Sequence, residues 1–304
     1  MKLPGALRVL LTVALLLGLP WWFDLDSVVA RLVDMRPGWV TLALGLSVIQ
    51  VAVLAWRWRF TAHRLGVGLS FVEAWREYYL SIFLNQVLPG GVMGDVSRAW
   101  RQARGRNRRE QGESGGPAAR AVIFERVSAQ AVMTSVALLS LLVLPVAVSR
   151  RSGTMIVTMA AAATVIVVAI GLWCRRQSSA QSPTGRVLAE LVSAHLSPLT
   201  FAVQATSGLF VVATYLATYV AAARAVGVET PFLVILPLVA PVLMTMLIPV
   251  TIAGWGLRES AAALLWGAVG LTATDGVAIS VAYGLIVLVG SFPGAAILAL
   301  GRRA

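Results

Sequence analysis

Residues 85–101 read NQVLPGGVMGDVSRAWR and interrupt an apolar region of the chain. Pro89 lacks the backbone N–H that a continuing helix would use, and glycines at positions 90, 91 and 94 weaken a helix further. A helix arriving through residues 80–88 is therefore predicted to end here. We expect the chain to break at Pro89, Gly91 and Gly94 and then to begin a new helix.

Polar residues follow this break at spacings that suit the start of a helix. Asp95 is a favourable N-cap residue, because its carboxylate can accept hydrogen bonds from the first free N–H groups. Arg98 and Arg101 are one helical turn apart. Free N–H groups and two guanidiniums together suit an anion. We therefore predict that Asp95, Arg98 and Arg101 form an anion-binding site.

Residues 247–260, LIPVTIAGWGLRES, show a similar pattern late in the chain. Three residue types recur at a constant separation of 160 positions: Pro89 and Pro249, Gly94 and Gly254, and Arg98 and Arg258. Gly256 adds a further helix-breaking residue. Coincidence is one explanation in a chain rich in glycine and arginine. The other is an inverted-topology repeat, in which paired broken helices mark a binding site near the membrane midplane.

The composition is that of a polytopic membrane protein. The 304-residue chain is 58% hydrophobic and 12% charged, with a mean hydropathy of +0.82. Its net charge of +12 comes from 24 arginines and one lysine. These cluster at the ends of apolar runs, which indicates membrane topology rather than nucleic-acid binding. One cysteine and two distant histidines, His63 and His195, give no metal-ligand spacing, so we expect neither a metal nor a cofactor.

Six apolar stretches are predicted to cross the membrane completely. They are residues 9–19, 39–56, 121–148, 154–173, 201–223 and 275–300. Arg57, Arg59 and Arg64 follow the second stretch and are expected at the cytoplasmic side by the positive-inside rule, which Arg150 and Arg151 oppose. The distribution of basic residues along the chain predicts that both termini lie in the cytoplasm. We expect the protein in the bacterial cytoplasmic (inner) membrane.

Residues 71–100 and 231–271 each hold a short apolar helix on either side of a break. Residues 80–88 form only about 14 Å of helix at 1.5 Å per residue, which cannot cross a bilayer. We predict two re-entrant hairpins, the first open to the inside and the second, interrupted by Pro237 and Pro241, open to the outside. The fold class is therefore all-α.

The whole chain, residues 1–304, is predicted to be a single integral membrane domain. Its halves, residues 39–148 and 201–300, would be related by inverted topology. Residues 101–120 are basic and rich in glycine, and they are expected to form a cytoplasmic loop.

Arg258 is predicted to lie at membrane depth, where an unpaired arginine costs about 2.5–3.5 kcal/mol on insertion scales. Glu259 is adjacent but projects from another face of a regular helix, so we do not expect the two to pair. We expect Arg98 and Arg258 to face a shared cavity and to hold an anionic head group in turn. The alternative is that both arginines extend to the membrane interfaces while the prolines only kink helices.

Two carboxylates are candidates for coupling transport to protons. Glu125 and Glu259 lie in apolar sequence, where a carboxylate can take up and release a proton. Structural pairing with an arginine is the alternative for each, and Arg126 is one candidate partner of Glu125. We therefore predict Glu125, Arg126 and Glu259 as cavity or coupling residues.

Three stretches resemble the transmembrane domain of the lysylphosphatidylglycerol synthase family, which is described as flippase-like. They are LPGGVMGDVSRAW at 88–100, AVIFERVSAQAVM at 121–133 and IPVTIAGWGLRES at 248–260. The resemblance implies lipid handling, because fused members of that family use this domain to move aminoacylated phosphatidylglycerol between leaflets. The chain ends at Ala304 without a soluble acyl-transfer domain, so we do not expect synthase activity.

The resemblance also implies which residues matter. The residues that match the first motif are Pro89, Gly94, Asp95 and Arg98, and those that match the second are Glu125 and Arg126. The third motif matches Pro249, Gly254, Gly256, Arg258 and Glu259. Gly90 and Gly91 occupy positions where more variable residues are expected, so the local backbone there departs from the family pattern.

The sequence favours a flippase-like transporter of an anionic phospholipid or lipid-linked intermediate over an enzyme. One alternative is an integral membrane transferase acting on a polyprenyl-phosphate or phospholipid substrate. Such an enzyme should gather several carboxylates or a histidine-based acid–base pair in one loop, and the acidic loop is residues 24–34. Another alternative is a non-catalytic membrane subunit that partners a glycosyl- or acyltransferase.

Overall fold

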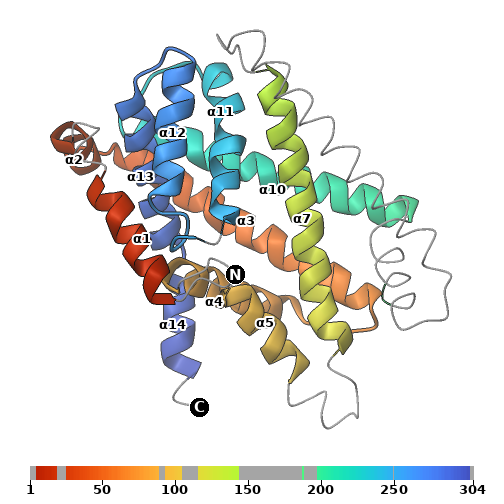
Figure 1. Cartoon of the computed structure of the whole chain (residues 1–304). Coiled ribbons are helices and arrows are strands. Elements are labelled where there is room, and N and C mark those ends of the chain that lie inside the picture. Colours follow the sequence, from red (N-terminus) through yellow and green to blue (C-terminus); the bar gives the residue numbers. More distant parts are fainter. Residues whose placement is uncertain are drawn as a thin grey trace.

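The structure is a computed structural model of the chain, and it describes residues 5–18, 25–88, 93–104, 116–143, 187, 197–248 and 250–301. The described residues are helical and contain no strand, which confirms the all-α class (Figure 1). The elements are α1 (Gly5–Gly18), α2 (Leu25–Val33), α3 (Pro37–Arg64), α4 (Phe71–Val87), α5 (Met93–Ala103), α7 (Gly116–Val143), α10 (Pro198–Ala225), α11 (Phe232–Met244), the 3-10 turn η2 (Thr245–Leu247), α12 (Leu257–Ala268), α13 (Ala273–Gly290) and α14 (Phe292–Gly301).

Four helical segments are long and apolar enough to cross a membrane. They lie at 37–64, 116–141, 198–225 and 273–300, and the last combines α13 with α14. A helix of 28 residues is about 42 Å long at 1.5 Å per residue, more than the hydrocarbon core of about 30 Å. These segments correspond to four of the six predicted spans, so the chain is a multi-pass membrane protein.

The first predicted span, residues 9–19, overlaps α1, and residue 19 lies outside the described residues. The described helix has 14 residues and is about 21 Å long, less than the hydrocarbon core of a bilayer. Its Thr12 hydroxyl accepts a hydrogen bond from the backbone N–H of Ile252 at 2.9 Å, so α1 lies against the second break. The span predicted at residues 154–173 lies outside the described residues.

The first hairpin consists of α4 and α5, which pack against each other. The Ser70 hydroxyl accepts the N–H of Glu73 and caps the start of α4. Pro89 and Gly91 lie outside the described residues, between the end of α4 and the start of α5. Beyond them, a Cβ on Gly94 would overlap the backbone carbonyl of Ser81. Only glycine allows this close approach of α5 to α4.

The second hairpin consists of α11, η2 and α12. Helix α11 continues through Pro237 and Pro241, which corrects the expectation that these prolines interrupt it. Neighbouring helices can satisfy the backbone groups that such prolines free. Pro249 lies outside the described residues, and after it φ is +49° at Ala253, +78° at Gly254 and +85° at Gly256. These left-handed conformations favour glycine and turn the chain into α12.

The two hairpins lie one above the other in Figure 1. In Figure 1, α11 and α12 lie above α4 and α5, and the turn between α11 and α12 faces the first hairpin. The main core joins α3, α10, α11, α12 and α13. Within it the Tyr219 ring lies 5.3 Å from the ring of Tyr283 and 6.1 Å from that of Trp266. This packing fixes the second hairpin against the spanning helices.

The close approach at Gly94 predicts a specific sensitivity to a single methyl group. Gly94→Ala should lower the free energy of unfolding by at least about 1–3 kcal/mol, the usual cost of overpacking, since the obstructing atoms are backbone. Gly45→Ala in α3 is the matched control, because a Cβ there meets no atom within 4 Å. Denaturant titration in detergent micelles measures both, and equal stabilities for the two variants would contradict the packing described.

Candidate functional site

Arg98 is completely buried in a cluster of charged and aromatic side chains. Its guanidinium carbon lies 4.0 Å from the centre of the Tyr78 ring and 4.6 Å from that of Trp58. Its Nη2 donates to Asp95 at 3.1 Å and to Glu125 at 3.4 Å. The Tyr78 hydroxyl also donates to Glu125, at 2.6 Å. A buried guanidinium needs such partners, and here they join α3, α4, α5 and α7.

Asp95 is the shared carboxylate of this cluster. It lies within the first turn of α5, not at the N-cap, which corrects the expected role. The close approach of α4 places the Ser81 hydroxyl 3.2 Å and the Asn85 amide 3.1 Å from its oxygens, so these groups donate to Asp95. The carboxylate also forms a salt bridge with Arg126 of α7 at 3.5 Å. Asp95 therefore ties the first hairpin to α7.

Arg57 is a buried cation whose hydrogen bonds all go to neutral oxygens. Its Nη1 donates to the Gln204 carbonyl at 2.6 Å and to the Ser207 hydroxyl at 2.7 Å. Its Nη2 donates to the Ser128 hydroxyl at 3.2 Å. This burial corrects the expectation that Arg57 marks the cytoplasmic end of its span, because α3 continues to Arg64.

Arg258 and Glu259 form a direct ion pair of 2.7 Å, contrary to the expectation that they do not pair. The N–H of Gly256 donates to Glu259 at 2.7 Å, so the glutamate folds back over the first turn of α12. Rules for side-chain faces apply to helix interiors, and at this helix start adjacent side chains meet. Arg258 also donates to Ser280 and lies 5.0 Å from the centre of the Trp255 ring.

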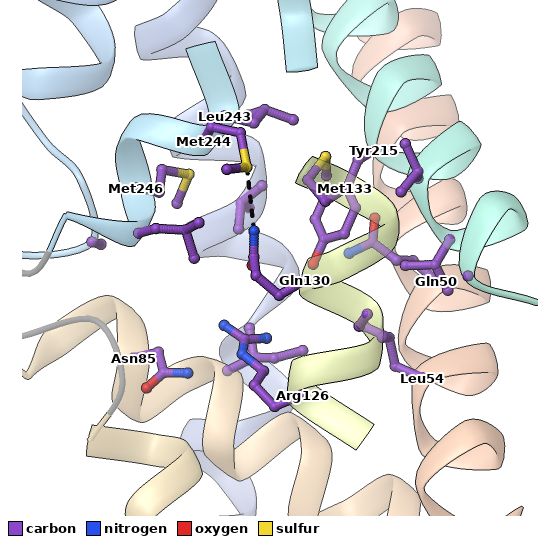
Figure 2. Close-up of a pocket in the computed structure, with 18 of the residues that line it drawn as sticks. Gln50, Leu54, Asn85, Arg126, Gln130, Met133, Tyr215, Leu243, Met244 and Met246 are labelled. Carbon is purple, nitrogen blue, oxygen red and sulfur yellow. Dashed lines mark hydrogen bonds between the residues drawn. The ribbon is translucent and has the colours of Figure 1, made fainter. Parts of the chain in front are cut away.

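A cavity of about 180 Å³ lies between the two hairpins (Figure 2). The first hairpin contributes Ile82, Asn85 and Gln86. The second hairpin contributes Leu243, Met244, Met246 and Leu247, and the turn before α12 contributes Ala253. Helix α7 contributes Arg126, Ala129, Gln130 and Met133, and α3, α10 and α13 complete the wall. Both interrupted segments thus line one space.

Among the described residues that line this cavity, Arg126 alone is charged. Of its side chain, 41% is exposed. Arg98 and Arg258 do not line it, which differs from the expectation of a cavity shared by those two arginines. Each is instead neutralised by adjacent carboxylates behind the wall. Met246, a lining residue, has its sulfur 3.9 Å from Arg258 Nη1 and separates that arginine from the space.

The other predicted site residues lie away from the cavity. Arg101 pairs with Glu77 at 2.7 Å on the outer part of the first hairpin. Glu125 and Glu259 are buried in their ion pairs and do not line the space. Within the described ranges, no three His, Cys, Asp or Glu side chains lie close enough to hold a metal ion.

Comparison with known families shows to which family the chain belongs. Residues 9–294 match the model of the family described as the lysylphosphatidylglycerol synthase TM region. The chain belongs to this family. The match covers both hairpins and α7, and it confirms the resemblance found in the three motifs.

Two relatives of this chain are described as UPF0104 membrane proteins. One, from Pyrococcus horikoshii, is 27% identical over 88 residues, which are 29% of this chain and 26% of the relative. The other, from Methanocaldococcus jannaschii, is 24% identical over 99 residues, which are 32% of this chain and 29% of the relative. The match therefore spans less than a third of the length of either relative.

Several polar residues that line the cavity were not among the predicted site residues. Gln50 and Gln130 lie on spanning helices and line the cavity with Tyr215. A carboxamide within an apolar span is costly in hydrocarbon. This cost could have marked the two glutamines as candidate site residues. Arg57 carried a similar signal, because it lies between Trp56 and Trp58 in a helix that continues beyond it.

The pairing of Arg98 with Glu125 predicts strong energetic coupling. Arg98→Leu should lower the free energy of unfolding by about 3–5 kcal/mol, since it leaves the buried Glu125 without its paired cation. Glu125→Leu should lower it by less, because Arg98 keeps its salt bridge to Asp95. The double variant should lose less free energy of unfolding than the two single variants lose together. A double-mutant cycle measured by denaturant titration checks this, and simple additivity would show that the pair carries no coupling.

Proposed function

We propose that this chain is a flippase-like transporter that moves an anionic phospholipid or lipid-linked intermediate across the cytoplasmic membrane. The observation that carries this proposal is a cavity lined by both interrupted hairpins, with the guanidinium of Arg126 facing it. Guanidinium groups match phosphate oxygens in charge and geometry. Membership of the lysylphosphatidylglycerol synthase TM family supports lipid handling.

The charge balance around the cavity favours an anion. Four arginines lie in or behind its wall, namely Arg57, Arg98, Arg126 and Arg258. Three carboxylates pair with them, namely Asp95, Glu125 and Glu259. Among the described residues this leaves one positive charge in excess, which a bound phosphate would neutralise. An uncompensated charge at membrane depth is costly, so anion binding here is favourable.

Asp95 holds the place that a phosphate would take. Its salt bridge to Arg126 is 3.5 Å long, whereas charge-assisted hydrogen bonds of this type are usually about 2.7–2.9 Å. Asp95 has further partners in Arg98, Ser81 and Asn85. Arg126 can therefore exchange Asp95 for a phosphate without leaving the carboxylate unpaired. Binding then weakens the tie between α7 and the first hairpin.

We include alternating access in this proposal. Each hairpin forms one wall of the same cavity, so a movement of either one would open the space in a different direction. We include in this proposal that the halves are inverted repeats and that the hairpins open to opposite sides of the membrane. The parallel burial of Arg98 and Arg258 against aromatic rings supports the repeat.

Leaflet exchange in proteoliposomes tests this function. Purified protein is reconstituted with fluorescent phosphatidylglycerol, and dithionite quenches the label in the outer leaflet. Arg126→Ala should slow exchange at least about tenfold, because a charged hydrogen bond contributes about 1.5–3 kcal/mol. Arg126→Lys should retain part of the rate, since it keeps the charge but loses the planar fork.

Arg36→Ala is the matched control, because Arg36 forms an exposed pair with Glu229 at 3.3 Å away from the cavity. It should exchange lipid at the wild-type rate. Wild-type exchange by Arg126→Ala would exclude the cavity as the route. Wild-type protein that moves no lipid by itself would instead favour a non-catalytic subunit or a transferase.

A further inference from the structure

The turn that leads into α12 is a strained part of the cavity wall. Ala253 lines the cavity and has a φ of +49°, a left-handed conformation that costs free energy for any residue with a side chain. The nearby Thr251 is buried, and its hydroxyl has no hydrogen-bond partner among the described residues. Strained backbone and unpaired buried hydroxyls persist only where the surrounding structure holds them. This turn therefore depends on its contacts.

Helix α1 contacts the turn before and after Ala253 in the sequence. The backbone N–H of Ile252 donates to the Thr12 hydroxyl at 2.9 Å. The Leu15 side chain covers Gly256 so closely that a Cβ on that glycine would overlap it. Thr12 and Leu15 are three residues apart in α1 and share one face of it. We call these two side chains the α1 clamp.

The Thr12 hydroxyl is oriented for this contact, because its own proton is already used. It donates to the carbonyl of Arg8 at 2.8 Å, one turn earlier in α1. The oxygen is then free to accept the N–H of Ile252. A backbone N–H that loses its acceptor inside a membrane is costly. Helix α1 can therefore leave the turn only if the turn also changes conformation.

The α1 clamp is the main attachment of its helix to the second hairpin. Of the side chains that the structure describes in α1, Thr12 alone is fully buried. The apolar side chains around it are exposed, namely Leu7, Val9, Leu10 and Val13. Such side chains lose little by facing lipid, because helices in a bilayer associate through close packing and hydrogen bonds. Figure 1 shows α1 at an edge of the bundle.

The turn connects two parts of the second hairpin. Before it lies η2, whose Met246 and Leu247 line the cavity, and after it lies α12. A change of φ at Ala253 would therefore move this part of the cavity wall relative to α12. The clamp thus acts on the side of the cavity that the second hairpin forms.

We propose that α1 is a gate helix for the cavity. The α1 clamp holds the turn before α12 in its strained, closed conformation, and release of α1 lets the turn relax and opens the cavity on the side of the second hairpin. This inference goes beyond the proposed function, since it concerns the control of opening and not the ligand. Thr12 and Leu15 are positioning residues, because they act through Ile252 and Gly256.

Thiol labelling in nanodiscs tests the clamp without a lipid assay. Leu243 lines the cavity and is 6% exposed, so Leu243→Cys in a Cys174→Ser background reports opening. Adding Thr12→Val keeps the shape of the side chain but removes the hydroxyl. It should raise the rate of labelling by a water-soluble maleimide about fivefold, the effect of losing one neutral hydrogen bond. Thr12→Ser keeps the hydroxyl and should stay within about twofold of the parent rate.

Thr41→Val is the matched control. The Thr41 hydroxyl donates to the carbonyl of Pro37 one turn earlier in α3, as Thr12 does to Arg8, but Thr41 is exposed and does not hold the turn. This variant should label at the parent rate. Equal labelling rates for Thr12→Val, Thr12→Ser and Thr41→Val would overturn the clamp.

A reversible cross-link separates a gate from a fixed anchor. Thr12→Cys and Ile252→Cys, again with Cys174→Ser, place two thiols within reach of a short bis-methanethiosulfonate reagent. The cross-linked protein should exchange fluorescent phosphatidylglycerol at least about tenfold more slowly, because opening must precede exchange. Reduction should restore the rate. Albumin back-extraction measures the exchange, since dithionite would itself reduce the cross-link.

The outcomes distinguish the gate from the transport function. Exchange that continues unchanged in the cross-linked protein would show that α1 is a fixed anchor and would overturn the gate. If no form of the protein exchanges lipid, the transport function fails, while the labelling rates still decide whether Thr12 holds the cavity closed.

Discussion

The carboxylate of Asp95 is shared by two arginines from different helices, and the arrangement of the site depends on this tie. It neutralises Arg98 inside the first hairpin and contacts Arg126 across to α7. Without it, the guanidiniums of Arg98 and Arg126 would lie close together with Glu125 as their remaining carboxylate. The tie also explains why Gly94 is required, since α5 must approach α4 closely for Ser81 and Asn85 to donate to Asp95.

The second hairpin also neutralises a buried arginine, but with different partners. Arg258 pairs with its neighbour Glu259 and lies near the rings of Trp255 and Tyr283, much as Arg98 lies between Tyr78 and Trp58. In both hairpins, a carboxylate and two aromatic rings hold an arginine behind the cavity wall. These two arginines therefore stabilise the broken helices, and Arg126 is left to face the space between them.

The sequence was sufficient to predict the helical class, the membrane setting, four spans and the positions of both breaks, because these follow from apolar periodicity, proline and glycine. It named Arg126 among the candidate cavity or coupling residues but assigned the head group to Arg98 and Arg258, which do not line the cavity. Arg98, Arg126 and Arg258 all lie in apolar sequence, and only the packing of α4 against α5 and the fold-back of Glu259 decide their neighbours. The burial of Arg57 was missed for the same reason, since its acceptors come from α7 and α10.

The central claim is that an anionic lipid head group occupies the space between the two hairpins and binds Arg126. The most direct measurement is an experimental structure of the protein in nanodiscs that contain phosphatidylglycerol. The account predicts a phosphate within about 3 Å of the Arg126 guanidinium, with Asp95 retained by Arg98. Lipid phosphates confined to the outer surface, with Arg126 still on Asp95, would contradict it.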